Sequence, residues 1–203
     1  MKYLFIISLS FIQLIAINAQ DDDIYSNVNN EEPNNLYNVY IGTSSGINNI
    51  NGVLGGILEL QVGQKVTGIG GLGLGLWGLK TTADLRIYKS YPQSIYYSFG
   101  LSYHTGWGNM QIDYTDPDTG DINAVDINFN PVTTLNLLIG FQWGISRDNR
   151  FRINLEGGYA FPLTREPYKI NTTFMQNDQN LIQSMDLLSP GGIILGMGLT
   201  MGF

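Results

Sequence analysis

Apolar and polar residues alternate along four long stretches of the chain, with the period of two that places successive side chains on opposite faces of a β-strand. In residues 132–146 the apolar positions are Leu135, Leu137, Ile139, Phe141, Trp143 and Ile145, and only Leu138 is out of class. Residues 94–107, 151–163 and 191–203 repeat this arrangement against small or polar residues. Alternation over ten or more residues is long for a soluble strand but normal for the tilted strands of ~9–11 residues that cross a membrane.

The alternation predicts eight antiparallel strands, an even number, as bacterial membrane barrels have. They are expected at residues 36–43, 53–62, 65–78, 81–89, 94–107, 132–146, 151–163 and 191–203. Gly70–Gly71 interrupts the alternation between Ile69 and Leu72, so a β-bulge is expected there. A soluble sandwich would also alternate, but the polar face here is rich in Gly, Ser and Thr, as the crowded interior of a narrow barrel requires. The sequence therefore predicts an all-β fold, an eight-stranded transmembrane β-barrel over residues 36–203.

The lengths of the connections predict which end of the barrel faces which side. With both termini in the periplasm, the turns near 63–64, 91–92 and 148–149 are periplasmic, and all three are short. The connections at the other end include residues 44–52, 108–131 and 164–190, and the last two are the longest in the chain. Short periplasmic turns and longer extracellular loops are typical of outer-membrane barrels.

The N-terminal residues predict export. Met1 and Lys2 precede an apolar run up to Ile17, and Ala16 and Ala19 are small residues at a cleavage position, so residues 1–19 are predicted to be a signal peptide. Residues 20–35, rich in Asp, Asn and Glu, are expected to form a solvated tail.

Composition excludes several kinds of chemistry. The chain has no cysteine, which rules out disulfides, thiol catalysis and cysteine metal sites. The formal net charge of −7 arises largely from the acidic tail, and no basic cluster indicates a nucleic-acid partner. No cofactor is expected.

Three residues near the C-terminus carry a resemblance to a known class. Gly198, Met201 and the terminal Phe203 resemble the C-terminal signal that outer-membrane barrels present to the barrel assembly machinery. Together with the strand pattern, they make the chain similar to the small OmpA/OmpX-like barrels of Gram-negative bacteria. The resemblance implies a bacterial outer-membrane location, lipid and the assembly machinery as partners, and a monomer.

Five charged residues are expected to face the interior by their parity in the strands. They are Glu59, Asp84, Arg86, Arg152 and Glu156. An eight-stranded barrel is only wide enough for side chains to fill it, and a buried unpaired charge is costly, so these groups are expected to pair as a polar plug. A narrow channel for small solutes is the alternative.

Two further groups of residues contain the residue types of known chemical sites. Ser102, His104 and Glu156 could form a Ser-His-carboxylate set, which leaves a lipid-active enzyme as a second alternative, although a histidine hydrogen-bonded inside the barrel is the simpler reading. The acids Asp113, Asp116, Asp118, Asp121 and Asp126 partly match a calcium loop. Its spacing fails at Gly120 and Asp121, so a solvated hairpin turn built by Pro117 and Gly120 is expected and no metal site is predicted.

The outward aromatic residues are expected in two rings at the membrane interfaces. Trp143, Phe151 and Phe203 belong to the periplasmic ring, and Tyr103, Trp107, Tyr159 and Phe161 to the outer ring. The sequence as a whole favours a non-enzymatic barrel that acts in a structural or surface-interaction role, with extracellular loops that contact a partner.

Overall fold

The computed structural model describes residues 37–90, 94–115, 120–146, 149–173 and 178–203. All of these residues belong to one unit, Asn35–Phe203. The predicted signal peptide (1–19) and acidic tail (20–35) lie outside the described residues.

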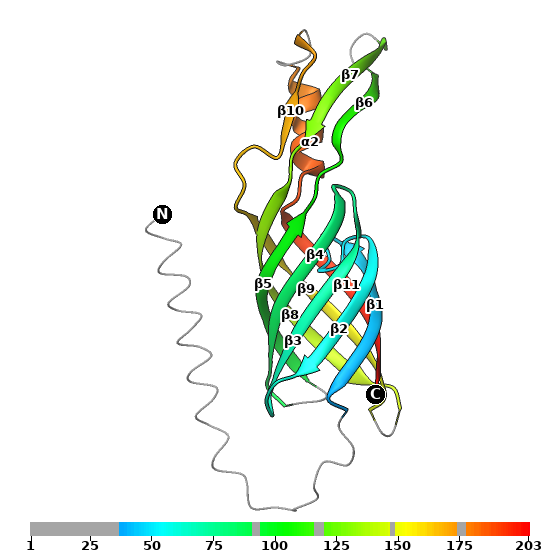
Figure 1. The fold of residues 1–203 in the computed structure, drawn as a ribbon, viewed down its shortest axis with the longest axis vertical. Helices are drawn as coiled ribbons and strands as arrows, with labels where there is room; N and C mark the ends of the chain where they lie inside the picture. Colours follow the sequence, from blue (N-terminus) through cyan, green and yellow to red (C-terminus); the bar gives the residue numbers. More distant parts are fainter. Residues whose placement is uncertain (1–36, 91–93, 116–119, 147–148, 174–177) are drawn as a thin grey trace, which may run out of the picture. The chain divides into compact units, whose positions relative to one another are not determined.

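Eight antiparallel strands close into a barrel in the order β1-β11-β9-β8-β5-β4-β3-β2 (Figure 1). They are β1 (Val39–Ile47), β2 (Leu54–Gln61), β3 (Val66–Gly75), β4 (Gly78–Tyr88), β5 (Ile95–His104), β8 (Val132–Gly144), β9 (Phe151–Pro162) and β11 (Gly192–Gly202). The predicted all-β, eight-stranded barrel is therefore confirmed, and each predicted segment contains most of one strand. The pairing of β1 with β11, from Tyr40↔Gly202 to Ile47↔Leu195, closes the sheet so that no barrel strand has a free edge.

Side chains alternate strictly between the two faces of the barrel. On β11, Leu195, Met197 and Leu199 point outward and are 54%, 59% and 49% exposed, whereas the inward Thr200 is 1% exposed. The same contrast runs round the barrel, so that large apolar residues cover its outside and polar residues its inside. This is the reverse of the distribution on a water-soluble surface.

The prediction of a β-bulge at Gly70–Gly71 is wrong. The register is continuous through both residues on either side, with Gly70 opposite Leu58 and Ala83. The alternation breaks in sequence because Ile69 points inward and is 4% exposed, while Leu72 points outward. An apolar residue on the inner face, rather than an inserted residue, explains the pattern.

The two ends of the barrel differ in their connections. At the end where β1 begins and β11 finishes, β2 is joined to β3, β4 to β5 and β8 to β9 by at most six residues each. At the opposite end the β3–β4 turn is short, but β5 and β8, and β9 and β11, are joined through further secondary structure. Two of the turns, at 91–93 and 147–148, lie outside the described residues in part.

The two longest connections, which were expected to be extracellular loops, fold together, and the hairpin expected within residues 108–131 is present as an antiparallel pair of strands. They form β6 (Gly108–Thr115), β7 (Ile122–Phe129), β10 (Tyr168–Ile170) and the helix α2 (Gln179–Leu188). The three strands make a second sheet in the order β10-β7-β6. We call these four elements the cap; Figure 1 shows them beyond the end of the barrel at which β5 finishes.

The cap has a hydrophobic core that it shares with the barrel. Val125, Ile127 and Phe129 from β7 pack with Ile170 of β10 and with two residues of α2. Trp77 and Val132 of the barrel belong to the same cluster. The cap therefore rests on the barrel through buried apolar contacts rather than through a bare linker. Within the described residues, no helix has the length and apolar character needed to span a membrane.

Candidate functional site: the filled lumen of the barrel

The lumen of the barrel is filled by polar side chains that the inward positions of the strands supply. Arg86, Arg152 and Glu59 are each at most 1% exposed. Glycines on the inner face make the room that these and other large side chains need. A Cβ on Gly140 would overlap the phenol ring of Tyr96, and one on Gly71 would overlap the amide oxygen of Asn51.

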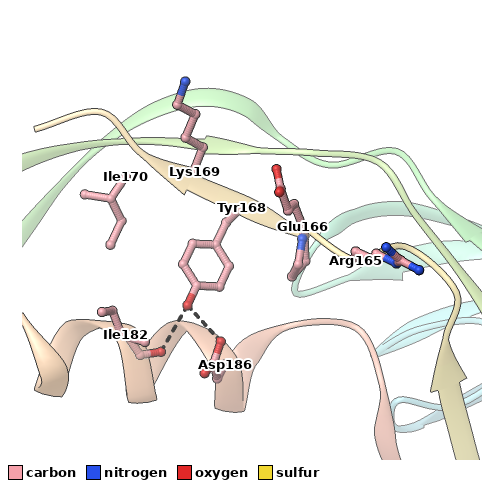
Figure 2. A pocket seen from close by; sticks show the side chains of 8 residues that line it. Arg165, Glu166, Tyr168, Lys169, Ile170, Ile182 and Asp186 are labelled. Carbon is pink, nitrogen blue, oxygen red and sulfur yellow. Dashed lines mark hydrogen bonds between the residues drawn. The ribbon is translucent and has the colours of Figure 1, made fainter. Parts of the chain in front are cut away.

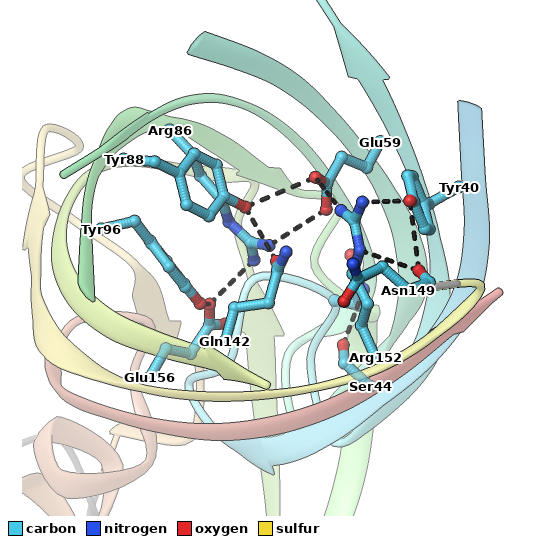
Figure 3. Close-up of polar contacts among 11 residues, drawn as sticks. Tyr40, Ser44, Glu59, Arg86, Tyr88, Tyr96, Gln142, Asn149, Arg152 and Glu156 are labelled. Carbon is cyan, nitrogen blue, oxygen red and sulfur yellow. Dashed lines mark hydrogen bonds and ion pairs between the residues drawn. The ribbon is translucent and has the colours of Figure 1, made fainter. Parts of the chain in front are cut away.

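Four of the five predicted interior charges lie in one chain of ion pairs (Figure 3). Arg86 Nη2 lies 2.9 Å from Glu156 Oε2, and Arg86 Nη1 lies 3.5 Å from Glu59 Oε2. The other oxygen of Glu59 lies 3.6 Å from Arg152 Nη1. The order Glu156–Arg86–Glu59–Arg152 alternates in sign and joins strands β9, β4, β2 and back to β9, so that it crosses the lumen.

Three tyrosines complete this layer and were not identified from the sequence. Tyr96 donates to Glu156 (3.1 Å) and lies under the Arg86 guanidinium, which is 4.6 Å from its ring centroid. Tyr88 donates to Gln142 (2.9 Å), and Tyr40 lies under the guanidinium of Arg152 at 3.4 Å. Such cation–π contacts stabilise desolvated cations. Since Tyr88 is two residues from Arg86 on the same strand, parity alone could have located it.

Asp84 is the exception among the five predicted residues. It points inward and is 4% exposed, but it forms no ion pair within the described residues. Both of its carboxylate oxygens are buried without a hydrogen-bond partner there. The expectation that all five charges pair is therefore wrong for Asp84, because Arg86 extends toward Glu59 and Glu156 instead.

The connection between β1 and β2 folds into the lumen at the end away from the ion pairs of Arg86. Asn49, Ile50 and Asn51 are at most 1% exposed. Both asparagine amides donate to Ser44 Oγ, at 2.8 and 2.7 Å, and the hydroxyl of Thr82 donates to the Ile50 carbonyl. This inward fold was not predicted, because residues 44–52 were expected to be an extracellular loop.

Lys80 holds this inserted loop in place. Its Nζ donates to the carbonyls of Asn48 (3.1 Å) and Asn49 (2.8 Å). Sequence reasoning missed Lys80, because it placed the β3–β4 turn after Gly78. The turn lies at Leu76–Trp77, so that Lys80 becomes an inward residue of β4.

The structure does not assemble the conceivable Ser-His-carboxylate set. Ser102 Oγ lies 2.8 Å from Thr82 Oγ1 and accepts from Asn136 at 2.6 Å. Glu156 is paired with Arg86, as described above. Among the described residues no hydrogen bond joins Ser102 to His104.

The residues of the predicted assembly signal lie on β11 and directly after it. Gly198 is on the inner face, Met201 is half-buried on the outer face, and Phe203 is 59% exposed. The backbone N–H of Phe203 donates to the Val39 carbonyl at 2.9 Å. Residues of the two predicted interfacial rings of aromatic side chains also point outward. The exposed fraction is 41–49% for Trp143, Phe151, Tyr103, Trp107 and Tyr159.

The acidic segment of the connection between β5 and β8 lies on the β6–β7 hairpin. Asp113, Asp121 and Asp126 are exposed, whereas Asp116 and Asp118 lie outside the described residues. Across the part of the chain that the structure describes, no group of three acidic or histidine side chains is arranged to hold a metal ion.

The cap also has an open depression between β10 and α2 (Figure 2). Tyr168 points across it and donates to Asp186 Oδ1 (2.8 Å) and to the Ile182 carbonyl (3.3 Å). Burial, and then the hydrogen bond to Asp186, raise the pKa of Tyr168 to about 12. These hydrogen bonds connect β10 to α2. The polar groups in the depression therefore serve to stabilise the cap.

The fold and its interior define a class of protein: an eight-stranded antiparallel β-barrel whose lumen is filled by paired charges and an inserted loop. No protein-family model matches the chain, and no curated protein matches it. Among solved structures, the chain is similar to the crystal structure of Acinetobacter baumannii CarO2, with a TM-score of 0.43 and 14% sequence identity over 84% of this chain and 100% of that chain. The class rests on the strand order and register of this chain itself.

Proposed function

We propose that this chain is a non-enzymatic outer-membrane barrel that holds the cap at the bacterial cell surface, where the cap contacts a partner. The observation that carries the proposal is the combination of a filled lumen with a folded cap at one end. A conduit needs a continuous polar path, and here the path is occupied at two levels. The cap, in contrast, is a structured surface of the kind that recognition uses.

The outside of the barrel supports its placement in a membrane. Large apolar side chains of the barrel strands are exposed on its outside. Examples are Leu72, Ile139 and Leu195, which are 54%, 51% and 54% exposed. In water such a continuous apolar surface would drive aggregation, whereas in lipid it is the favourable arrangement. Because the barrel is closed, every strand finds its backbone partners internally, as a bilayer requires.

The lumen supports a structural role over transport. The chain of ion pairs from Glu156 to Arg152 crosses the interior at one level, and Ile50 with its neighbouring asparagines occupies another. Removing one partner of a buried ion pair is costly, because the other charge is then left buried and unpaired. A channel would need to displace both layers at once.

The test is the sidedness of two introduced cysteines, which would be unique because the chain has none. Ile122→Cys lies in the cap at a residue that is 72% exposed, and Gln64→Cys lies in the exposed β2–β3 turn at the other end of the barrel. A membrane-impermeant maleimide added to intact Gram-negative cells should label Ile122→Cys alone. It should label Gln64→Cys only after the outer membrane is permeabilised.

The opposite labelling pattern would contradict the proposed orientation. Labelling of both cysteines in soluble extract, with none in the membrane fraction, would contradict the membrane location itself.

A further inference from the structure

A cavity of about 220 Å³ lies at the mouth of the barrel, where the ends of β1, β3 and β4 approach the C-terminal end of α2. We call it the mouth pocket and define it by Ile47, Leu76, Lys80, His104, Leu187 and Leu188, which line it. It is separate from the layer of ion pairs around Arg86 and from the depression beside Tyr168. Its wall combines inward residues of the barrel with residues of the cap.

The inner part of the mouth pocket is polar and only partly satisfied. Lys80 is 1% exposed and His104 is 5% exposed, and the two are paired residues of β4 and β5. The ammonium of Lys80 has three donors, of which two are directed at the Asn48 and Asn49 carbonyls. It forms no ion pair with a carboxylate of the described residues.

The imidazole of His104 has an unused polar atom in the same place. Its Nδ1 is buried and has no hydrogen-bond partner among the described residues. Buried polar groups are normally hydrogen-bonded, so an orphaned ring nitrogen beside an ammonium that lacks an ion pair points to a missing acceptor. An anion supplies such an acceptor and also neutralises the buried charge.

The outer part of the mouth pocket is apolar and unusually exposed. Ile47 and Leu76 are 65% and 66% exposed, and Leu187, although it belongs to the cap, is 86% exposed. Together with Leu188 they form the exposed apolar part of the wall, whereas Lys80 and His104 are buried. The site thus offers a cation at one end and hydrocarbon at the other.

We propose that the mouth pocket binds a single-chain carboxylate amphiphile of the fatty-acid class. The carboxylate accepts hydrogen bonds from Lys80 Nζ and from His104 in the tautomer protonated on Nδ1. The chain lies along Leu76, Leu187 and Leu188. The cavity is smaller than the ~300–1,000 Å³ of typical small-molecule pockets, so it encloses the head and the first carbons while the rest of the chain follows the exposed leucines.

The experiment measures octanoate binding to the full chain in lipid nanodiscs by equilibrium dialysis, with empty nanodiscs subtracted. Detergent is avoided because it is itself an amphiphile. Octyltrimethylammonium and octanol, which have the same chain with a cationic or neutral head, are the matched probes. Saturable binding of one octanoate per chain is expected, with neither matched probe binding at that site.

Two variants place the ligand. Lys80→Met should weaken octanoate binding about ten-fold or more, because it removes the charged donor. Gly75→Val fills the pocket: its Cβ would be in ordinary contact with the Gly78 carbonyl at 3.6 Å and with His104 Nδ1 at 3.9 Å, and the position has no positive φ, so no clash or strain arises at the Cβ. It should abolish binding.

Gly68→Val is the control on the same strand, where an added Cβ meets nothing within 4 Å, and it should bind like the wild type. Because Gly75→Val keeps Lys80 and the inserted loop, it also answers the question if Lys80→Met does not fold. Equal binding of octanoate and octyltrimethylammonium, or unchanged octanoate binding by folded Gly75→Val, would overturn the proposal. Neither result depends on whether the cap has a partner, which the surface-labelling experiment addresses separately.

Discussion

Arg86 links two strands of the interior layer, because it contacts carboxylates from both, Glu59 and Glu156. Arg86→Met would leave Glu156 with only the hydroxyl of Tyr96 and Glu59 with one cation fewer. Removing one member of a buried ion pair typically costs ~3–5 kcal/mol, and a similar loss in the free energy of unfolding is expected here. Urea unfolding in liposomes measures it.

Lys89→Met is the matched control for Arg86→Met, since Lys89 directly follows the same strand and is exposed. Its effect should stay within ~0.5 kcal/mol, as for most surface changes. If the two variants unfolded at the same urea concentration, the ion pairs would not be stabilising the barrel.

Parity in the sequence located the charged residues of the lumen but could not determine their partners. All five predicted side chains point inward because the side-chain period of a strand is fixed at two. Which cation meets which carboxylate depends on the register between neighbouring strands. The alternation of residues within one strand does not determine that register. Asp84 shows the difference: its parity is the same as that of Arg86, yet only Arg86 reaches the carboxylates.

At the scale of elements, the barrel strands were predictable and the cap was not. Each barrel strand has one face in contact with the outside and one with the lumen, so its alternation is long and regular. In the cap, β7 buries Val125, Ile127 and Phe129 on one face, a signal that was present but short. The helix α2 has ten residues and a single clear local marker, Asp178, which accepts from the N–H groups of Asn180 and Leu181 as its N-cap.

Trp77 connects the cap to the barrel and provides a test at this scale. It is 2% exposed, packs edge-on against Phe129 with ring centroids 4.8 Å apart, and donates from Nε1 to the Asn130 carbonyl at 3.1 Å. Replacing a buried Trp by Ala typically costs ~3–5 kcal/mol. Because Phe129, the aromatic partner of Trp77, is in the cap, Trp77→Ala should speed proteolysis of the cap while the barrel stays folded.

Trp143→Ala is the control, since Trp143 is 43% exposed on the outside of the barrel. The cap of the Trp143→Ala variant should be cleaved at the wild-type rate. Equal protection of the cap in Trp77→Ala and wild type would mean that the cap holds its structure without the barrel.

At the scale of the whole molecule, two barriers occupy the lumen and each comes from a different part of the sequence. One is the set of inward charges and tyrosines of the strands, and the other is the connection between β1 and β2 folded back onto Ser44 and Lys80. The first follows from alternation and the narrow radius of eight strands. The second follows from polar contacts distant in sequence from the loop, such as those of Lys80 and Thr82, so the pattern of loop lengths did not predict it.

Single-channel recording of the full chain in a planar lipid bilayer tests the central claim of a filled barrel most directly. The same preparation is first shown to be inserted, by maleimide labelling of Ile122→Cys from one side only. An inserted protein should then give no steady conductance above the bare bilayer, because Arg86 and its partners and the loop around Ile50 occupy the lumen. A steady, ohmic conductance from the inserted Ile122→Cys protein, which is otherwise the natural sequence, would contradict the account and make the barrel a channel.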